Sequence, residues 1–194
     1  MDGHLSPGTL LLSAPEMLDP NFMHAVVLMI HHDDDGAMGV VVNASMESRV
    51  GDALPEHPVL KSVDAPLWQG GPVGLDSLQV LHRHPPVDGG DLVGVPGVDV
   101  GDGVRVGADL DWASQAVARG VGGPVHVRFV VGYSGWAAGQ LEDEIATCSW
   151  LPLEPRAELV FGEGSRGAIW RRAMSRLQGG GSSLAHLPPD PSWN

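Results

Sequence analysis

Polar and aromatic residues that could bind a ligand gather beside two glycine-rich segments of the sequence. The first segment, Gly70-Gly71-Pro72, directly follows Gln69, and the second runs from Gly132 to Gly139. Glycine permits positive φ angles and close backbone approach, so both segments are expected to be turns that could meet. If they meet, they would form a ligand-binding cleft lined by Gln69, His82, Tyr133, Trp136, Gln140 and Glu144. The alternative is that the glycines only form turns and that the aromatic rings pack in the core.

Two potential nucleophiles lack the partners that catalysis requires. Ser134, within Gly132-Tyr133-Ser134-Gly135, is similar to the G-x-S-x-G elbow of hydrolases but is one residue short of it. The sequence places no histidine and acid beside it. Cys148 has no nearby base or cation, so we expect a buried structural thiol rather than a reactive one. No catalytic residue is predicted.

Two groups of potential metal ligands are also incomplete. His82 and His84 would share one side of a strand, but Pro85 ends that strand and no third ligand is evident. The run Asp33 to Asp35 before Gly36 resembles the start of a calcium loop without its spaced ligands or distal glutamate. We therefore expect satisfied or surface histidines, a solvated acidic turn, and no metal or cofactor.

Basic residues concentrate on the last predicted helix. Arg166, Arg171, Arg172 and Arg176 are four of the 11 lysines and arginines in the chain. They could form an exposed face that complements an acidic body. The alternative is a docking site for an acidic partner or nucleic acid.

Hydrophobic periodicity places these residues on short strands and helices. Val125, Val127, Phe129 and Val131 alternate with polar positions, which is typical of a strand leading into the second glycine segment. Ser48, Asp109 and Ser165 are suitable helix N-caps. The predicted strands are 9–13, 25–31, 38–43, 67–69, 78–83, 125–131 and 157–161, and the predicted helices are 48–54, 109–118, 140–147 and 165–177. Segments 25–31 and 38–43 should form a hairpin.

Length and composition indicate one acidic domain. The 194 residues, 43% of them hydrophobic, favour a single α+β domain over residues 1–178 with a flexible tail over 179–194. The formal net charge of −13 argues against direct nucleic-acid binding and against anionic membranes. A single cysteine, no visible signal peptide and no long apolar run lead us to expect a cytoplasmic protein without membrane contact.

Three phrases of the sequence resemble a known bacterial family. They are LLLSAPEMLDPNFMHAVVLMIHHDDDGAMGVVVN, QGGPVGLDSLQVLH and GYSGWAAGQLEDEIATCSWL, in that order. In their spacing they resemble the YqgE/AlgH family over nearly all of residues 9–177. Departures are confined to the divergent loop 87–106 and the Gly/Ser/Pro-rich tail.

The resemblance implies an α+β fold whose bent, bifurcated mixed β-sheet forms a pseudo-barrel with peripheral helices. It implies no catalytic residue, because the family has no established activity. Some members are labelled transcriptional regulators. We therefore expect a non-enzymatic protein that binds an unknown small molecule or protein partner. The alternatives are a transcriptional regulator that acts indirectly and an enzyme with an unrecognised site.

Overall fold

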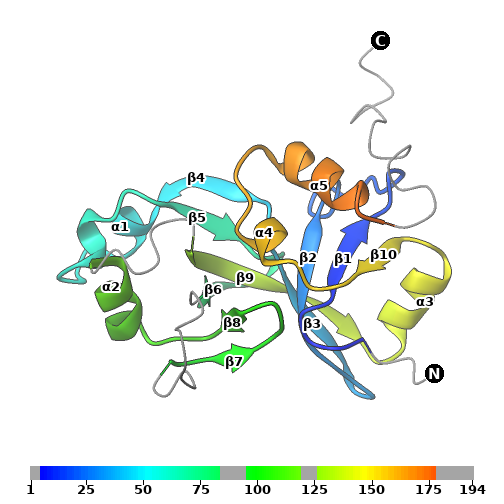
Figure 1. Cartoon of the computed structure of the whole chain (residues 1–194), viewed down its shortest axis with the longest axis horizontal. Helices are drawn as coiled ribbons and strands as arrows, with labels where there is room; N and C mark the ends of the chain where they lie inside the picture. Colours follow the sequence, from blue (N-terminus) through cyan, green and yellow to red (C-terminus); the bar gives the residue numbers. More distant parts are fainter. Residues whose placement is uncertain (1–4, 84–94, 119–125, 178–194) are drawn as a thin grey trace, which may run out of the picture.

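The computed structural model describes residues 5–83, 95–118 and 126–177 (Figure 1). Its ten strands form one open sheet with the path β10-β1-β2-β3-β9-β6-β8-β7, from which β4 and β5 branch. The strands are β1 (Leu10–Ser13), β2 (Val26–Asp33), β3 (Gly36–Val41), β4 (Ser45–Arg49), β5 (Pro66–Gln69), β6 (Val73–Arg83), β7 (Val98–Asp99), β8 (Val104–Val106), β9 (Val127–Ala137) and β10 (Trp150–Leu153). The helices are α1 (Val50–Ala53), the 3-10 turn η1 (Leu60–Ser62), α2 (Leu110–Ala118), α3 (Gln140–Ala146), α4 (Ala157–Val160) and α5 (Arg166–Met174).

Strand β9 divides the sheet into two branches. One of its edges pairs with β6, whereas its other edge is shared by two strands. Near its end, Ser134 pairs with Gly39 of antiparallel β3, and earlier Val130 pairs with Trp68 of parallel β5. In Figure 1, β9 crosses the middle of the molecule, with β1, β2 and β3 toward one end and α1 and α2 toward the other. This geometry confirms the expected bent, bifurcated α+β sheet, which stays open rather than closing into a barrel.

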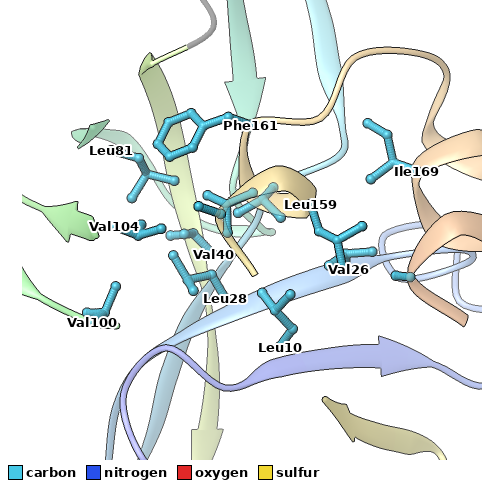
Figure 2. Packing of buried hydrophobic residues seen from close by; sticks show 14 of the residues in the cluster. Leu10, Val26, Leu28, Val40, Leu81, Val100, Val104, Leu159, Phe161 and Ile169 are labelled. Atoms are coloured by element: carbon cyan, nitrogen blue, oxygen red, sulfur yellow. The ribbon is translucent and has the colours of Figure 1, made fainter. Parts of the chain in front are cut away.

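The largest hydrophobic cluster lies between the first three strands and the C-terminal helices (Figure 2). Leu10, Leu28 and Val40 contribute from the sheet, and Leu159 and Ile169 contribute from α4 and α5. Full burial of such a side chain is worth about 1.5–3 kcal/mol, so this cluster supplies much of the stability of the fold. None of the helices in the described ranges is long and apolar enough to span a bilayer.

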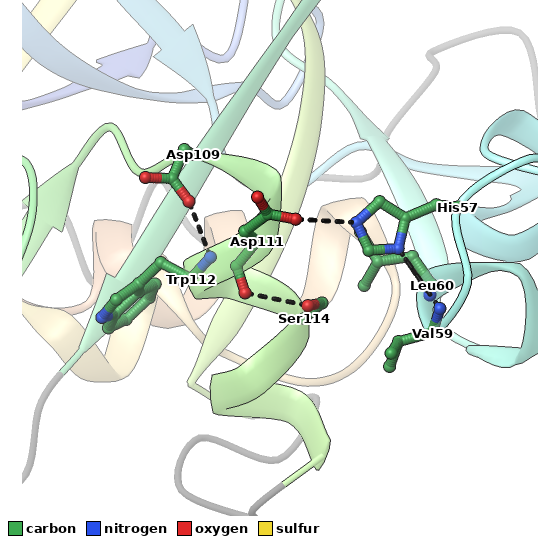
Figure 3. A network of polar contacts seen from close by, with 7 residues as sticks. All are labelled: His57, Val59, Leu60, Asp109, Asp111, Trp112 and Ser114. Carbon is green, nitrogen blue, oxygen red and sulfur yellow. Dashed lines mark hydrogen bonds and ion pairs between the residues drawn. The ribbon is translucent and has the colours of Figure 1, made fainter.

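Polar contacts join α2 to the segment that precedes η1 (Figure 3). The Asp109 carboxylate accepts a 2.7 Å hydrogen bond from the amide of Trp112, which confirms Asp109 as the cap of α2. His57 Nδ1 accepts from the amide of Leu60 at 3.2 Å, and its Nε2 lies 3.8 Å from the Asp111 carboxylate. This end of the sheet is therefore fixed by polar contacts as well as by apolar packing.

Most predicted elements are confirmed. The hairpin of β2 and β3, the helix α3 and the helix α5 all lie where periodicity placed them. Ser165 caps α5, because its hydroxyl accepts from the amide of Ala168 at 3.3 Å. The predicted cap at Ser48 is wrong, since that residue lies in β4 and Arg49 precedes α1 without a side-chain cap. The tail 179–194 lies outside the described residues.

Two other predictions are wrong for physical reasons. The segment predicted as a strand over 157–161 instead forms helix α4, Ala157–Val160, because a short apolar run does not distinguish the two structures. The segment from Gly132 to Ala137 continues β9 rather than forming a turn. Gly132 has a φ of 73° within this strand, so the backbone bends there without ending the strand. The turn comes only at Gly139, with a φ of 76°.

His24 is a buried histidine on the loop between β1 and β2. Its ring lies 4.6 Å from the ring of Trp170. Burial lowers the pKa of His24 below its ordinary value of 6.5, and the charges of Arg166 and Arg171 lower it further. The folded protein therefore resists protonation at this position more strongly than the unfolded chain does.

We predict that His24 makes the protein less stable as the pH falls through 6.5. Below that value the unfolded chain binds a proton that folded His24 does not, so the free energy of unfolding decreases. The variant His24→Asn, whose side chain tolerates the positive φ of this position, should lose less stability between neutral and mildly acidic pH. Urea unfolding at several pH values measures the effect, and parallel pH curves for both proteins would contradict it.

Candidate functional site

The two glycine segments lie directly against each other. The amide of Gly70 donates a 2.8 Å hydrogen bond to the carbonyl of Val131. A Cβ at Gly70 would lie 2.3 Å from the carbonyl oxygen of Gly132, and one at Gly71 would lie 2.2 Å from that of Tyr133. Only glycine allows two backbones to approach this closely. The close approach holds β5 and the start of β6 against the middle of β9.

Three of the six predicted ligand-binding residues form one hydrogen-bonded cluster. Glu144 Oε2 accepts from the indole nitrogen of Trp136 at 2.9 Å and from that of Trp150 at 2.7 Å. Glu144 Oε1 accepts from Gln140 Nε2 at 2.8 Å. Both indole rings are buried and meet edge to face at 5.9 Å. These contacts attach α3 and β10 to the end of β9.

The other three residues lie elsewhere on the sheet. Gln69 and Tyr133 are half-buried on β5 and β9. His82 pairs with Val127 at the start of β9, whereas Trp136 lies near the end of that strand. The structure therefore separates His82 from the Glu144 cluster. A ligand-binding role for the six residues stays a prediction.

The two candidate nucleophiles differ in their surroundings. Ser134 is buried, and its hydroxyl donates to the carbonyl of Gly70 at 3.2 Å, so the group stabilises the junction of the glycine segments. The expectation that Cys148 is buried is wrong, because its thiol is exposed. Cys148 lies in the turn after α3 with a φ of 58°.

Neither of the two groups of potential metal ligands considered in the sequence forms a metal site among the described residues. Residues 5–83, 95–118 and 126–177 contain no cluster of three or more potential ligands. His82 instead contacts the ring of Trp112 at 4.4 Å. His84 lies outside the described residues.

The arginines of α5 are partly used inside the molecule. Arg166 donates to the carbonyl of Asn21, and Arg172 donates to the carbonyl of Glu163 at 3.3 Å. Arg176 lies 3.5 Å from the Glu158 carboxylate. Two of these contacts are to backbone carbonyls, and only Arg176, two residues after α5, pairs with an acidic side chain of the same domain.

Arg128 is the only buried arginine, lysine or acid in the described residues, and the sequence prediction missed it. It lies on β9, where alternation directs Val127 and Phe129 to one face and Arg128 to the other. Its guanidinium carbon lies 3.6 Å from the centre of the Trp68 ring, a cation–π contact. The sequence does carry a signal for this residue, because Arg128 places a permanent charge in the apolar run from Val127 to Val131.

The guanidinium of Arg128 has unused donors. It donates through Nη1 to the carbonyl of Val42 and through Nη2 to that of Gly162 at 2.5 Å. The Nε group is buried and has no hydrogen-bond partner among the described residues. Burial lowers the pKa of Arg128 to about 9, which leaves the side chain positively charged at neutral pH. An arginine has five N–H groups, and these two bonds use one hydrogen on each Nη. Because Nε is shielded, a ligand would have to bond to the remaining Nη hydrogens.

A cavity of about 230 Å³ opens beside this guanidinium. Trp68 and Phe161 form aromatic walls, and Ser45 lies on the rim. The cavity is lined by Ser45, Ala65, Pro66, Trp68, Val127, Arg128, Phe161, Gly162, Glu163 and Gly164. An apolar cavity with one buried cation can hold a small molecule that carries a negatively charged group.

Comparison with known proteins identifies the family of this fold. A family model described as AlgH-like matches residues 10–181. The chain belongs to the AlgH-like family. It is 35% identical over 191 residues to a UPF0301 protein of Chlorobium limicola, covering 98% of this chain and 96% of that relative. It is 34% identical to a UPF0301 protein of Streptomyces coelicolor, covering 96% and 94% of the two chains.

Two solved structures share this architecture. The solution structure of AlgH from Pseudomonas aeruginosa has a TM-score of 0.66 and 27% identity, with 94% of each chain covered. The crystal structure of DIP2367 from Corynebacterium diphtheriae has a TM-score of 0.77 at 23% identity, covering 94% and 93% of the two chains. The resemblance seen in the three sequence phrases is therefore confirmed. The names of these proteins state no activity.

We predict that the Glu144 cluster contributes strongly to stability. Glu144→Ala leaves two buried indole N–H groups without their acceptor, which should cost about 2 kcal/mol of unfolding free energy. Glu144→Gln keeps one acceptor oxygen and should cost less. Urea unfolding measures both changes. Asp143→Ala, at an exposed position of the same helix, is the control and should change stability by less than about 0.5 kcal/mol. Equal losses for Asp143→Ala and Glu144→Ala would contradict the prediction.

Proposed function

We propose that this AlgH-like protein is a non-enzymatic, cytoplasmic binding protein and that the cavity at Arg128 is its ligand site. The observation that carries the proposal is a buried, incompletely hydrogen-bonded guanidinium on a residue that lines an open cavity. We infer that the ligand is a small molecule with a carboxylate or a similar oxyanion.

The energetics of Arg128 support an anionic ligand. A buried charge without a counterion is unfavourable, because burial removes its hydration. No acidic side chain of the described residues forms an ion pair with Arg128. An anion that entered the cavity would supply the missing counterion. It would do so without repositioning the arginine, which is already held by Trp68, Val42 and Gly162.

The position of the cavity also suits a regulatory role. Its walls come from β4, β5 and β9 and from the loop after α4, which are distant in sequence. A ligand that contacts all of them would stabilise the branch point of the sheet. Such stabilisation could be sensed by a protein partner, so an indirect role in transcription remains compatible with the same site.

We predict that pentanoate binds in the cavity. Backbone amide signals of Trp68, Gly162 and Gly164 should shift in a ¹H–¹⁵N NMR titration, since these residues line the cavity. Ser45→Trp should fill the rim and abolish these shifts without changing Arg128. Ser48→Trp, on the same strand but not on the cavity wall, should leave them intact.

The titration also defines what would overturn the proposal. Arg128→Lys keeps the charge but loses the planar fork, so it should weaken binding by about tenfold or more. If pentanoate and a neutral analogue, pentanamide, both leave the cavity amides unshifted, the cavity is not a ligand site. Shifts that persist unchanged in Ser45→Trp would place binding elsewhere.

A further inference from the structure

Two opposite charges line the Arg128 cavity without pairing with each other. Arg128 is only 3% exposed, whereas Glu163 is exposed on the loop between α4 and α5. No ion pair within 4.0 Å joins the two in the described structure. The charge of Glu163 nevertheless acts on the guanidinium, because it raises the pKa of Arg128 against the larger effect of burial. The cavity therefore has a cation at its wall and an anion nearby.

The loop that carries Glu163 is held in place. Arg128 donates to the carbonyl of Gly162, and Arg172 donates to that of Glu163 at 3.3 Å. A Cβ at Gly162 would lie 3.0 Å from the carbonyl of Glu158, so this part of the backbone packs tightly on α4. Glu163 is thus attached to a fixed backbone beside the cavity rather than to a freely moving loop.

A simple anion would meet conflicting electrostatics in this cavity. It would be attracted by Arg128 but repelled by Glu163, and the apolar walls screen charges less than water does. A molecule with both charges avoids the conflict. Its carboxylate would contact the unused Nη hydrogens of Arg128 and its ammonium group would face Glu163.

We propose that the ligand of the Arg128 cavity is a small zwitterion of the α-amino acid class with an apolar side chain. The inference rests on the proposed function, because it assigns the chemistry of the same site. Apolar atoms of Ala65, Pro66 and Val127 and the rings of Trp68 and Phe161 would contact the side chain of the ligand. The volume of about 230 Å³ suits a molecule of this size.

A matched set of three ligands tests the inference. Norvaline, pentanoate and pentylamine share one carbon chain and differ in charge, and their affinities can be compared by NMR titration or calorimetry. Wild-type protein should bind norvaline about threefold to fivefold more tightly than pentanoate, as expected for one partly exposed ion pair. Pentylamine should bind least well, since Arg128 repels it.

The variant Glu163→Gln gives a signature that a merely structural role would not produce. It should weaken norvaline binding by about threefold to fivefold and strengthen pentanoate binding, because one pair is lost and one repulsion is removed. Glu154→Gln, the same charge change at an exposed position off the cavity wall, should alter neither affinity.

The outcomes separate the inference from the proposed function. If wild-type protein binds pentanoate as tightly as norvaline, or if Glu163→Gln moves both affinities in one direction, the zwitterion inference fails while the anion site stands. If neither ligand binds in a way that Ser45→Trp abolishes, the proposed function fails with it.

Discussion

The close approach of two backbones at the glycine segments is the constraint on which the rest of the structure depends. Gly70 and Gly71 lie against Gly132 and Tyr133 with no space for a side chain. The contact lets β5 join β9 on the edge that β3 occupies farther along. Without it, the sheet could not divide in two. The division also explains why one strand carries both the Arg128 cavity and the Glu144 cluster at opposite ends.

The buried polar groups at the two ends of β9 differ in how completely they are hydrogen-bonded. At the Glu144 end, each of the two buried indole donors has an acceptor. At the Arg128 end, a buried cation keeps an unpaired donor beside a cavity. Satisfied networks stabilise a protein, whereas an incompletely satisfied buried charge costs free energy that an external partner can recover. This contrast is why we assign binding to the cavity and a structural role to the cluster.

Local patterns in the sequence predicted local structure well. Two apolar runs joined by the turn at residues 32–36 identified the β2–β3 hairpin, and caps at Asp109 and Ser165 identified two helices. Of the six predicted cleft residues, Trp136, Gln140 and Glu144 do lie together, and the spacing of four residues between Gln140 and Glu144 on one helix made that contact predictable. The surroundings of a residue are harder to predict when they depend on pairing between strands that are far apart in the sequence. His82 lies beside Val127 rather than near Trp136, and only the register of β6 on β9 determines this. The burial of Arg128 could not be predicted from local patterns, because its stacking partner, Trp68, comes from another strand of the sheet.

The pairing of β1 with β10 has a consequence for how the chain folds during synthesis. Leu10 pairs with Leu153, and the carbonyl of Ser13 accepts a hydrogen bond from the indole of Trp170 on α5, the last helix of the described chain. Strand β1 therefore precedes by about 140 residues the β10 and α5 segments that cover one of its edges and one of its faces. Such long sequence separations slow folding and leave an unpaired strand edge exposed meanwhile. A nascent chain of this family would thus be most vulnerable to aggregation just before the β10–α5 region emerges.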